Sequence, residues 1–364
     1  MKLKEIEIEN GFLRNREKLF NAISPFGNRF AIITHENIAE LYGNQLLETL
    51  NAAGLNTSLF IFPAGEKNKS RESKAAIEDQ LLSHSFGRDS CIIALGGGIV
   101  TDFAGFVAAT FARGIPYVSI PTSLLAMVDA SVGGKTGVNT SFGKNLIGAI
   151  YQPKKVIIDP DTLQTLPLKN LSEGFVEMIK HGLVADADYF SFLESHANEL
   201  LSLDFNLLNK AIYESCKIKK SIVEEDEFEG GKRRLLNFGH TVGHALEKLT
   251  DYTLSHGEAV ALGLLIEGQF STINIERIRN ILTLYGLPLQ MPPFSIDQLL
   301  EAMVLDKKSL KGKPRFVILQ TIGSPLPFDG HYCAEIDPLA IKQAFSKIII
   351  NANLPSGKSP SFKV

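Results

Sequence analysis

The chain has 364 residues, of which 45% are hydrophobic and 21% charged, and its formal net charge is −3. This length predicts two domains. The basic residues do not cluster in the sequence as binding to a nucleic acid requires, so a nucleic-acid partner is not expected. No apolar stretch approaches the ~20 residues that span a bilayer, so we expect no membrane contact. The three cysteines, Cys91, Cys216 and Cys333, show no paired spacing, and the N-terminus has no signal-peptide pattern. Both features predict a cytoplasmic protein with reduced thiols.

The first half of the chain alternates strand and helix patterns. The first eight residues alternate polar and apolar side chains like a strand. Further strands are expected over residues 29–34, 57–62, 90–95, 117–120 and 156–158, and helices over 37–50 and 70–85. Because the strands are almost wholly apolar, they predict a parallel sheet covered by helices on both faces.

The second half is dominated by helical periodicity. Helices are expected over residues 171–183, 188–201, 205–227, 238–249, 257–273 and 296–305, with one strand over 316–319. We therefore expect an α/β domain over residues 1–167 and a mainly α-helical domain over 168–364. The lysines at 217, 219 and 220 precede four acidic residues, which predicts a solvated helix face. The polar tail from Asn353 is expected to fray.

A glycine-rich turn, Gly96-Gly97-Gly98, follows the strand expected at 90–95. Glycines here let the backbone approach a pyrophosphate, and the next helix offers free N–H groups with Asp102 expected in its first turn. Such a turn also forms without any ligand. A second loop, Gly65 to Lys69, follows another strand and strengthens the dinucleotide interpretation, because parallel sheets bind ligands at that edge.

The segment over residues 121–148 combines glycines with charged and amide side chains, including Asp129, Lys135, Asn139, Lys144 and Asn145. Close backbone approach beside positive charge is typical of a phosphate or polyol pocket. The alternative is a mobile surface loop with solvated lysines, although its apolar residues favour a packed segment.

A histidine cluster opens the helix expected at 238–249. His240 and His244 lie four residues apart and share a face, and His256 precedes the next helix. This spacing favours a zinc-type site with His240 and His244 as the ligand pair. Hydrogen-bonded core histidines are the alternative, and the spacing leaves the carboxylate ligand open among Glu173, Glu177, Glu247 and Glu258.

Two further polar sets lie near this cluster. Glu177 and Lys180 share a helix face among apolar neighbours, which favours a buried site over a surface ion pair. Lys219, Arg233 and Asn237 lead into the histidine helix. Buried cations there would need an anion such as a substrate carboxylate or phosphate.

Seven motifs in order resemble the signatures of the 3-dehydroquinate synthase family, one of the sugar phosphate cyclases related to metal-dependent polyol dehydrogenases. They are GEKxK at 65–69, GGGxxxD at 96–102, VDASVGGKTGVN at 128–139, GKNLIGAIYQP at 143–153, EMIKHG at 177–182, NFGHTVGHALE at 237–247 and SHGEAVALG at 255–263. The resemblance covers residues 63 to 319. Ala64 and Thr101 depart from the family pattern, which affects details of cofactor contact and not the reacting groups.

The resemblance changes the ligand assignment. It implies that Glu177, His240 and His256 bind one divalent metal, zinc or cobalt, and that His244 instead contacts substrate or water. It also implies that NAD binds one set of residues: Gly65, Glu66, Lys69, Gly97, Gly98, Asp102, Thr122, Ser123, Lys135, Lys144, Thr162, Leu163, Gln164 and Thr165.

The implied reaction converts 3-deoxy-D-arabino-heptulosonate 7-phosphate to 3-dehydroquinate and phosphate, in the shikimate pathway that leads to aromatic amino acids. Transient oxidation by NAD, phosphate β-elimination, re-reduction and an intramolecular aldol closure make up the cycle. The resemblance implies the catalytic residues Lys180, Lys219, Arg233, Asn237 and His244. It implies the substrate contacts Arg113, Asp129, Lys135, Asn145, Lys307 and Lys308, with Arg113 reaching across a homodimer.

Three alternatives stay open. Another sugar phosphate cyclase would lack the substrate carboxylate and should alter the set of Lys219, Arg233, Asn237 and His244, which is intact here. A metal-dependent polyol phosphate dehydrogenase would form lasting NADH without releasing phosphate. A non-catalytic NAD-binding protein should have lost a metal ligand or a phosphate-binding lysine, and none is missing from the sequence.

Overall fold

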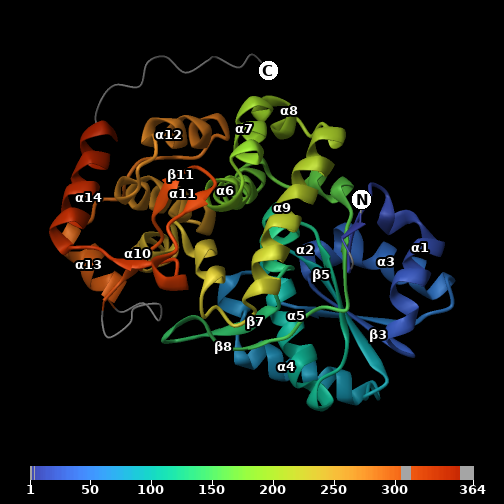
Figure 1. Cartoon of the computed structure of the whole chain (residues 1–364). Helices are drawn as coiled ribbons and strands as arrows, with labels where there is room; N and C mark the ends of the chain where they lie inside the picture. The colour runs from blue at the N-terminus through green and yellow to red at the C-terminus, as the bar shows by residue number, and fades with distance from the viewer. Residues whose placement is uncertain (1, 4, 305–312, 353–364) are drawn as a thin grey trace. The chain divides into compact units, whose positions relative to one another are not determined.

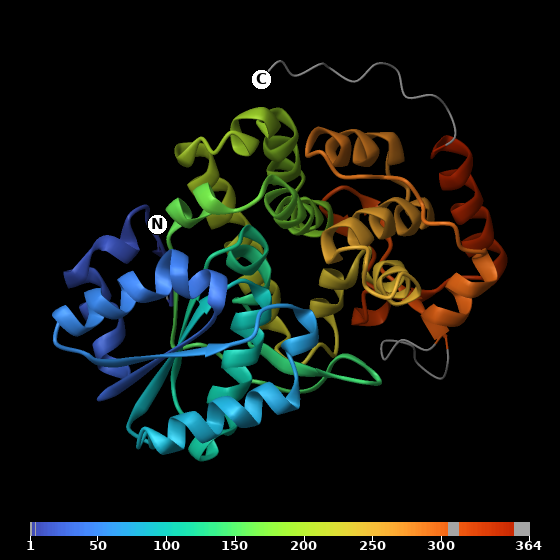
Figure 2. The same ribbon diagram turned by 180° about the vertical axis from the view of Figure 1, so that it is seen from behind.

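The structure is a computed structural model, and it describes residues 2–3, 5–304 and 313–352. The chain divides into two compact units (Figures 1 and 2). The first comprises residues 1–178 and 198–228, and the second comprises residues 179–197 and 229–364. The domain boundary expected after residue 167 stays a prediction. In the described part of the chain, no helix has the length and apolar character that a membrane span requires.

The first unit is built on a seven-stranded sheet in the order β1-β2-β9-β6-β5-β3-β4. Among the strands that the structure describes in this sheet, only the β1–β2 pair is antiparallel. The strands are β1 (Lys2–Leu3), β2 (Ile6–Ile8), β3 (Arg29–His35), β4 (Asn56–Phe62), β5 (Ser90–Gly96), β6 (Tyr117–Pro121) and β9 (Lys155–Ile158). The parallel sheet is confirmed.

Helices cover both faces of this sheet. Alternate residues of β3 point to opposite sides: Ile33 packs against α4 (Arg71–Ser83) and α5 (Gly98–Thr110), and Ile32 packs against α1 (Arg16–Ile23) and α3 (Asn44–Ala52). Burial on both faces explains why the strands read as unbroken apolar runs. Between β3 and α3 the chain forms α2 (Glu36–Ile38) and a π-helical turn, η3 (Ala39–Gly43), where one continuous helix was expected.

Two elements of the first unit differ from the expectation more strongly. The glycine-rich segment contains a second π-helical turn, η6 (Ala126–Ala130), and an antiparallel hairpin of β7 (Lys135–Thr140) and β8 (Gly143–Ile150). The helix α9 (Phe205–Glu225) also belongs to this unit. Its lysine run is not a solvated face as expected: the side chain of Lys217 is 58% exposed, but that of Lys219 is only 7% exposed. Lys220 pairs with Glu5 and Glu224.

Helix α6 (Leu168–Ala185) contributes residues to both units. The other helices of the second half are α7 (Ala187–Ser195), α8 (Ala197–Leu201), α10 (His240–Leu249), α11 (His256–Glu267), α12 (Ile275–Leu284), α13 (Ile296–Val304) and α14 (Pro338–Ala352). Two small antiparallel pairs accompany them, β10 (Arg315–Phe316) with β13 (Ala334–Glu335) and β11 (Leu319–Thr321) with β12 (Ser324–Pro325). The helix-rich second half is confirmed.

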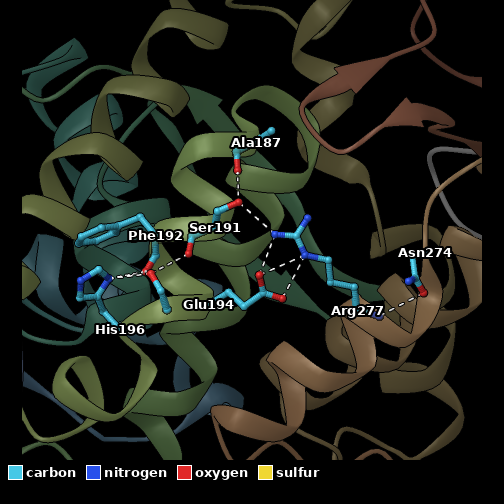
Figure 3. A network of polar contacts seen from close by, with 8 residues as sticks. Ala187, Ser191, Phe192, Glu194, His196, Asn274 and Arg277 are labelled. Atoms are coloured by element: carbon cyan, nitrogen blue, oxygen red, sulfur yellow. Dashed lines mark hydrogen bonds and ion pairs between the residues drawn. The ribbon is translucent and has the colours of Figure 1, made fainter.

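A polar network fixes α12 against α7 within the second unit (Figure 3). The Arg277 guanidinium donates to both carboxylate oxygens of Glu194, at 3.1 and 2.7 Å, and to the Ser191 hydroxyl at 3.0 Å. Its carbon lies 4.9 Å from the centre of the Phe190 ring. Such a two-pronged arginine contact specifies one orientation of the two helices.

Candidate active site

The glycine turn lies where the strand order of the first unit reverses. From β5 the chain continues to β6 and β9 on one side, while β3 and β4 lie on the other. Ligands of parallel sheets bind outside the carboxyl ends of the strands at this point. Gly96 has φ +156°, and a Cβ there would meet Val100 at 2.6 Å, so the turn requires glycine. No side chain caps α5 at Gly97, which leaves its N-terminal N–H groups facing the turn.

Thr122 and Ser123 border this turn from the end of β6. The Thr122 N–H donates to the Gly96 carbonyl oxygen at 3.0 Å. A Cβ on Gly97 would lie 3.3 Å from the Ser123 hydroxyl oxygen, so backbone and hydroxyl meet closely. The predicted cofactor residues of these two loops therefore lie together.

Asp102 lies one turn further along α5 than expected, because the helix begins at Gly98. Its carboxylate accepts a 2.6 Å ion pair from Lys69, whose side chain is 3% exposed. Burial raises the pKa of the Asp102 carboxyl, and the Lys69 ammonium opposes this shift. Lys69 also donates to the Asn145 side-chain oxygen at 2.6 Å. The pair thus joins the Gly65–Lys69 loop to α5 and the hairpin.

The residues 162–165 follow β9 in the 3-10 turn η7 (Pro160–Thr165), at the same edge of the sheet. The Tyr42 hydroxyl donates to the Thr162 carbonyl oxygen at 3.0 Å and contacts the Thr165 hydroxyl. Sequence reasoning missed Tyr42, since only the π-helical turn at residues 39–43 brings it here.

Asp129 and Lys219 form a second ion pair in the first unit. The Lys219 ammonium donates to a carboxylate oxygen of Asp129 at 2.6 Å and also contacts its carbonyl oxygen. Asp129 projects from η6 and Lys219 from α9. Two residues that the resemblance assigns to substrate thus lie together, although 90 positions separate them.

Where the structure describes them, the residues that the resemblance assigns to the substrate phosphate lie at the surface of the first unit. Lys135 and Asn145 on the hairpin are exposed, as is Arg113, at φ +70°. Lys144 of the same hairpin, which the resemblance assigns to NAD, is half-buried. Lys307 and Lys308 lie outside the described residues.

Three histidines gather within the second unit. The ring centres of His240 and His244 are 5.4 Å apart, those of His240 and His256 5.3 Å, and those of His244 and His256 6.3 Å. His240 Nδ1 lies 3.2 Å from the Phe238 carbonyl oxygen, so it carries the proton and leaves Nε2 as a metal donor. His256 Nδ1 lies 3.4 Å from a carboxylate oxygen of Glu247.

Glycines create this cluster by letting α10 and α11 touch backbone to backbone. A Cβ on Gly263 would lie 1.9 Å from the Gly239 carbonyl oxygen, and one on Gly243 would lie 3.2 Å from the Ala259 carbonyl oxygen. Gly239 itself has φ +80°. Across this contact the start of α10 meets the second half of α11, and the close approach of the two backbones lets the His240 and His256 rings lie 5.3 Å apart.

Glu267 holds the start of α10 from the far end of α11. Its carboxylate oxygens accept the N–H groups of Gly239 and Val242, each at 2.9 Å, and its side chain is fully buried. A carboxylate at a helix N-terminus satisfies donors that the helix leaves open. Sequence reasoning missed this residue, because a glutamate at the end of an apolar helix carries no local signal.

Within the second unit, His244, Glu247 and His256 each offer a donor atom close enough to the others to hold a metal ion. This set combines imidazole and carboxylate donors, which suit zinc or cobalt. Glu177 and Lys180 are 0% and 1% exposed, which confirms the expectation that this part of α6 is buried.

Arg233 and Asn237 lie on the 3-10 turn η8 (Lys232–Asn237) just before α10. Arg233 is 2% exposed. The Asn237 amide donates to the Glu229 carboxylate at 2.6 Å. Glu229 has φ +63° and was not predicted, because the acidic run before it was read as solvated surface.

Two family models match the chain in succession: the 3-dehydroquinate synthase N-terminal model over residues 59–173 and the C-terminal model over 174–309. The chain belongs to the 3-dehydroquinate synthase family. It is an enzyme, and its activity is that of this family. The 3-dehydroquinate synthase of Desulforamulus reducens is 45% identical over 308 residues, which cover 82% of this chain and 86% of that protein. That of Nitrosomonas europaea is 45% identical over 332 residues, 89% of each chain.

Solved structures agree on the fold. A 2-epi-5-epi-valiolone synthase from Streptomyces hygroscopicus, with NAD+ and Zn2+ bound, has a TM-score of 0.87 at 25% identity and covers 96% of this chain and 98% of its own. A 2-deoxy-scyllo-inosose synthase with NAD+ and Co2+ has a TM-score of 0.85 at 23% identity and covers 94% and 96%. A glycerol dehydrogenase from Schizosaccharomyces pombe reaches 0.66 at 15% identity, covering 96% of this chain and 89% of its own. The chain thus has the sugar phosphate cyclase fold.

Proposed function

We propose that this enzyme binds NAD and one divalent metal, and closes 3-deoxy-D-arabino-heptulosonate 7-phosphate into 3-dehydroquinate with release of phosphate. The observation that carries this proposal is the histidine cluster of His240, His244 and His256, with ring centres 5.3–6.3 Å apart. In a member of this family, such a cluster beside the buried Arg233–Asn237 turn suits a substrate that carries both hydroxyls and a carboxylate.

The first unit fits NAD by two features. Its glycine turn is a cradle that a Cβ at Gly96 would fill, and the N-terminus of α5 suits a pyrophosphate. We assign NAD contacts to the turn, to Asp102, to Lys135 and Lys144, and to the loops at 65–69, 122–123 and 162–165. When bound there, NAD would supply reversible hydride transfer at carbon 5 of the substrate.

The donor chemistry of Glu177, His240 and His256, one carboxylate and two imidazoles, suits one zinc or cobalt ion. We prefer this set over the one with His244 and Glu247 because it matches the family motifs. An ion held by these residues would supply Lewis acidity, which would lower the pKa of the substrate hydroxyl and polarise its carbon–oxygen bond. The Phe238 carbonyl fixes the tautomer of His240, and the Glu247 carboxylate does the same for His256.

The remaining assignments come from the family resemblance, and the charges of the residues suit them. Arg233 holds the substrate carboxylate by two parallel hydrogen bonds. His244 and Asn237 guide proton transfers, since imidazole titrates near neutral pH, and Lys180, Lys219 and Asp129 bind the hydroxyl groups. Lys135, Asn145, one of Lys307 and Lys308, and Arg113 hold the phosphate.

We further propose a homodimer in which Arg113 acts on the partner's substrate. In support, Arg113 is exposed, and the hairpin of the same unit presents Phe142, Leu146 and Ile150 at 89%, 43% and 38% exposure. Apolar side chains gathered on one hairpin are typical of an interface. Light scattering should give twice the protomer mass of 39.9 kDa. We place the enzyme in the cytoplasm and in the shikimate pathway.

The experiment that tests the function follows inorganic phosphate and NADH absorbance together, with purified enzyme, NAD, zinc and the heptulosonate phosphate. Phosphate release without lasting NADH, abolished by a chelator, is the expected result. Lasting NADH without phosphate would instead make the protein a polyol phosphate dehydrogenase. Inactivity with this substrate and turnover of a neutral sugar phosphate would overturn the assignment of Arg233.

A further inference from the structure

Asn139, at the end of β7, joins two parts of the first unit by four hydrogen bonds. Its backbone N–H donates to the Lys69 carbonyl oxygen at 2.7 Å. Its side-chain amide donates to the carbonyl oxygen and to a carboxylate oxygen of Glu66, at 3.1 and 2.7 Å. Its side-chain oxygen accepts the Asn145 N–H at 3.0 Å. Neither the amide nitrogen nor the carbonyl oxygen of the side chain is left without a partner.

The residue on the far side of this junction is held in an uncommon conformation. Asn145 has φ +54°, a left-handed backbone that side chains other than glycine seldom adopt. Asn139 binds its backbone N–H, and the Lys69 ammonium binds its side-chain oxygen at 2.6 Å. Asn139, Lys69 and Asn145 therefore form a closed ring of contacts that determines where the Asn145 amide lies.

Apart from the bond to Asn145, which lies within the hairpin, neither part depends on Asn139 for its own backbone pairing. The hairpin has its own pairing from Lys135 with Ile150 to Thr140 with Gly143. The loop at 65–69 is closed by Asn68 N–H to Gly65 and Lys69 N–H to Glu66. The bonds of Asn139 to Lys69 and Glu66 instead fix the position of the loop relative to the hairpin.

We propose that Asn139 is a positioning residue that couples NAD binding at the Gly65–Lys69 loop to the placement of Asn145, so that NAD and the phosphorylated substrate bind cooperatively. The inference rests on the proposed function, which assigns NAD to the Gly65–Lys69 loop and the substrate phosphate to Asn145. A ligand that orders Glu66 and Lys69 also orders Asn145 through Asn139, so the second ligand binds a site that is already arranged. The coupling is reciprocal by thermodynamic necessity.

The test uses the zinc-loaded full chain and three variants. Asn139→Ala removes both side-chain connections. Asn139→Asp keeps the acceptor for Asn145 but cannot donate to Glu66 and places a carboxylate against its carboxylate. Asn51→Ala is the matched control, because Asn51 also joins two elements, α3 and β4, by bonds to the Thr57 backbone at 3.0 and 3.4 Å.

Two quantities are measured for each protein. The first is the Kd of NAD, by calorimetry. The second is the coupling factor, which is the KM of NAD at sub-saturating substrate divided by the KM of NAD at saturating substrate, from phosphate-release assays. We expect the wild type to show a factor of about five or more. Asn139→Ala should weaken NAD binding about ten-fold and bring the factor near one. Asn139→Asp should weaken NAD binding at least as much while raising the substrate KM less than Asn139→Ala does.

The control Asn51→Ala should keep the wild-type factor even if its melting temperature falls. An unchanged NAD Kd and coupling factor in Asn139→Ala would overturn the proposal, as would a wild-type factor of one. Failure of the proposed function is distinguishable, because it would appear as wild-type enzyme that releases no phosphate. Calorimetry with NAD alone would then still decide whether Asn139 supports the loop.

Discussion

Replacing Glu267 by glutamine tests whether the histidine cluster depends on a buried carboxylate 23 residues away in the chain from His244. The carboxylate accepts two backbone N–H groups, each at 2.9 Å. Glutamine keeps one acceptor and turns an NH2 group toward the other N–H. Losing one charge-assisted hydrogen bond in a buried place costs about 1.5–3 kcal/mol, and losing the negative charge at the helix start costs roughly 0.3–1 kcal/mol more.

Because α10 begins with His240, part of this cost should appear as weaker metal binding. We expect the zinc Kd, measured by competition with a chromophoric chelator, to rise about 10- to 100-fold in Glu267→Gln. Hydrogen exchange at Gly239 and Val242 should accelerate in parallel. Glu276→Gln is the control, because Glu276 also places a carboxylate at the start of a helix, α12, but its side chain is 63% exposed. A zinc Kd within two-fold of wild type in Glu267→Gln would refute this reasoning.

Three further predictions concern the same two units. Gly263→Ala should strongly lower both the melting temperature and the zinc content, because its Cβ would lie 1.9 Å from the Gly239 carbonyl oxygen; normal zinc content would contradict this packing. Lys69→Met should raise the already elevated pKa of Asp102. A raised carboxyl pKa makes stability fall as pH rises through it, so the variant's deficit in urea midpoint should be largest at neutral pH and shrink toward pH 4; a deficit independent of pH would count against this. Burial raises the pKa of the Cys91 thiol to about 12, so iodoacetamide at pH 8 should label it only in urea; mass spectrometry of the native enzyme showing labelled Cys91 would disprove this.

The sheet was predictable because burial on both faces leaves a strong local pattern. Strands such as β5 are apolar at nearly every position, and helices between them, such as α4, have one apolar and one polar face. The hairpin of β7 and β8 was not predicted, because its glycines and polar residues at 135–145 match neither period. Its position against the loop at 65–69 depends on contacts that no window of neighbouring residues contains.

The candidate site was predictable in its residue types and less so in its supports. Motif order pointed to the histidines and to Lys219, whose burial then contradicted the charge pattern around it. Glu267 and Tyr42 were not predicted, because each one hydrogen-bonds to backbone groups that are far away in the sequence. For Glu267, which binds two N–H groups, the sequence shows only one acidic residue in an apolar helix, and this pattern does not predict its partners.

The π-helical turn at Ala126–Ala130 has a consequence for how this site can vary. A π-turn is wider than an α-helical turn, since its hydrogen bonds link residues five apart. Removing one residue there would restore a regular helix and rotate every later side chain of the segment by about 100°. Asp129 would then face away from the Lys219 ammonium, which it now contacts at 2.6 Å. Relatives that differ by a single-residue deletion in this turn should therefore have replaced both partners of the pair, so alignment gaps here should coincide with a change at the position of Lys219.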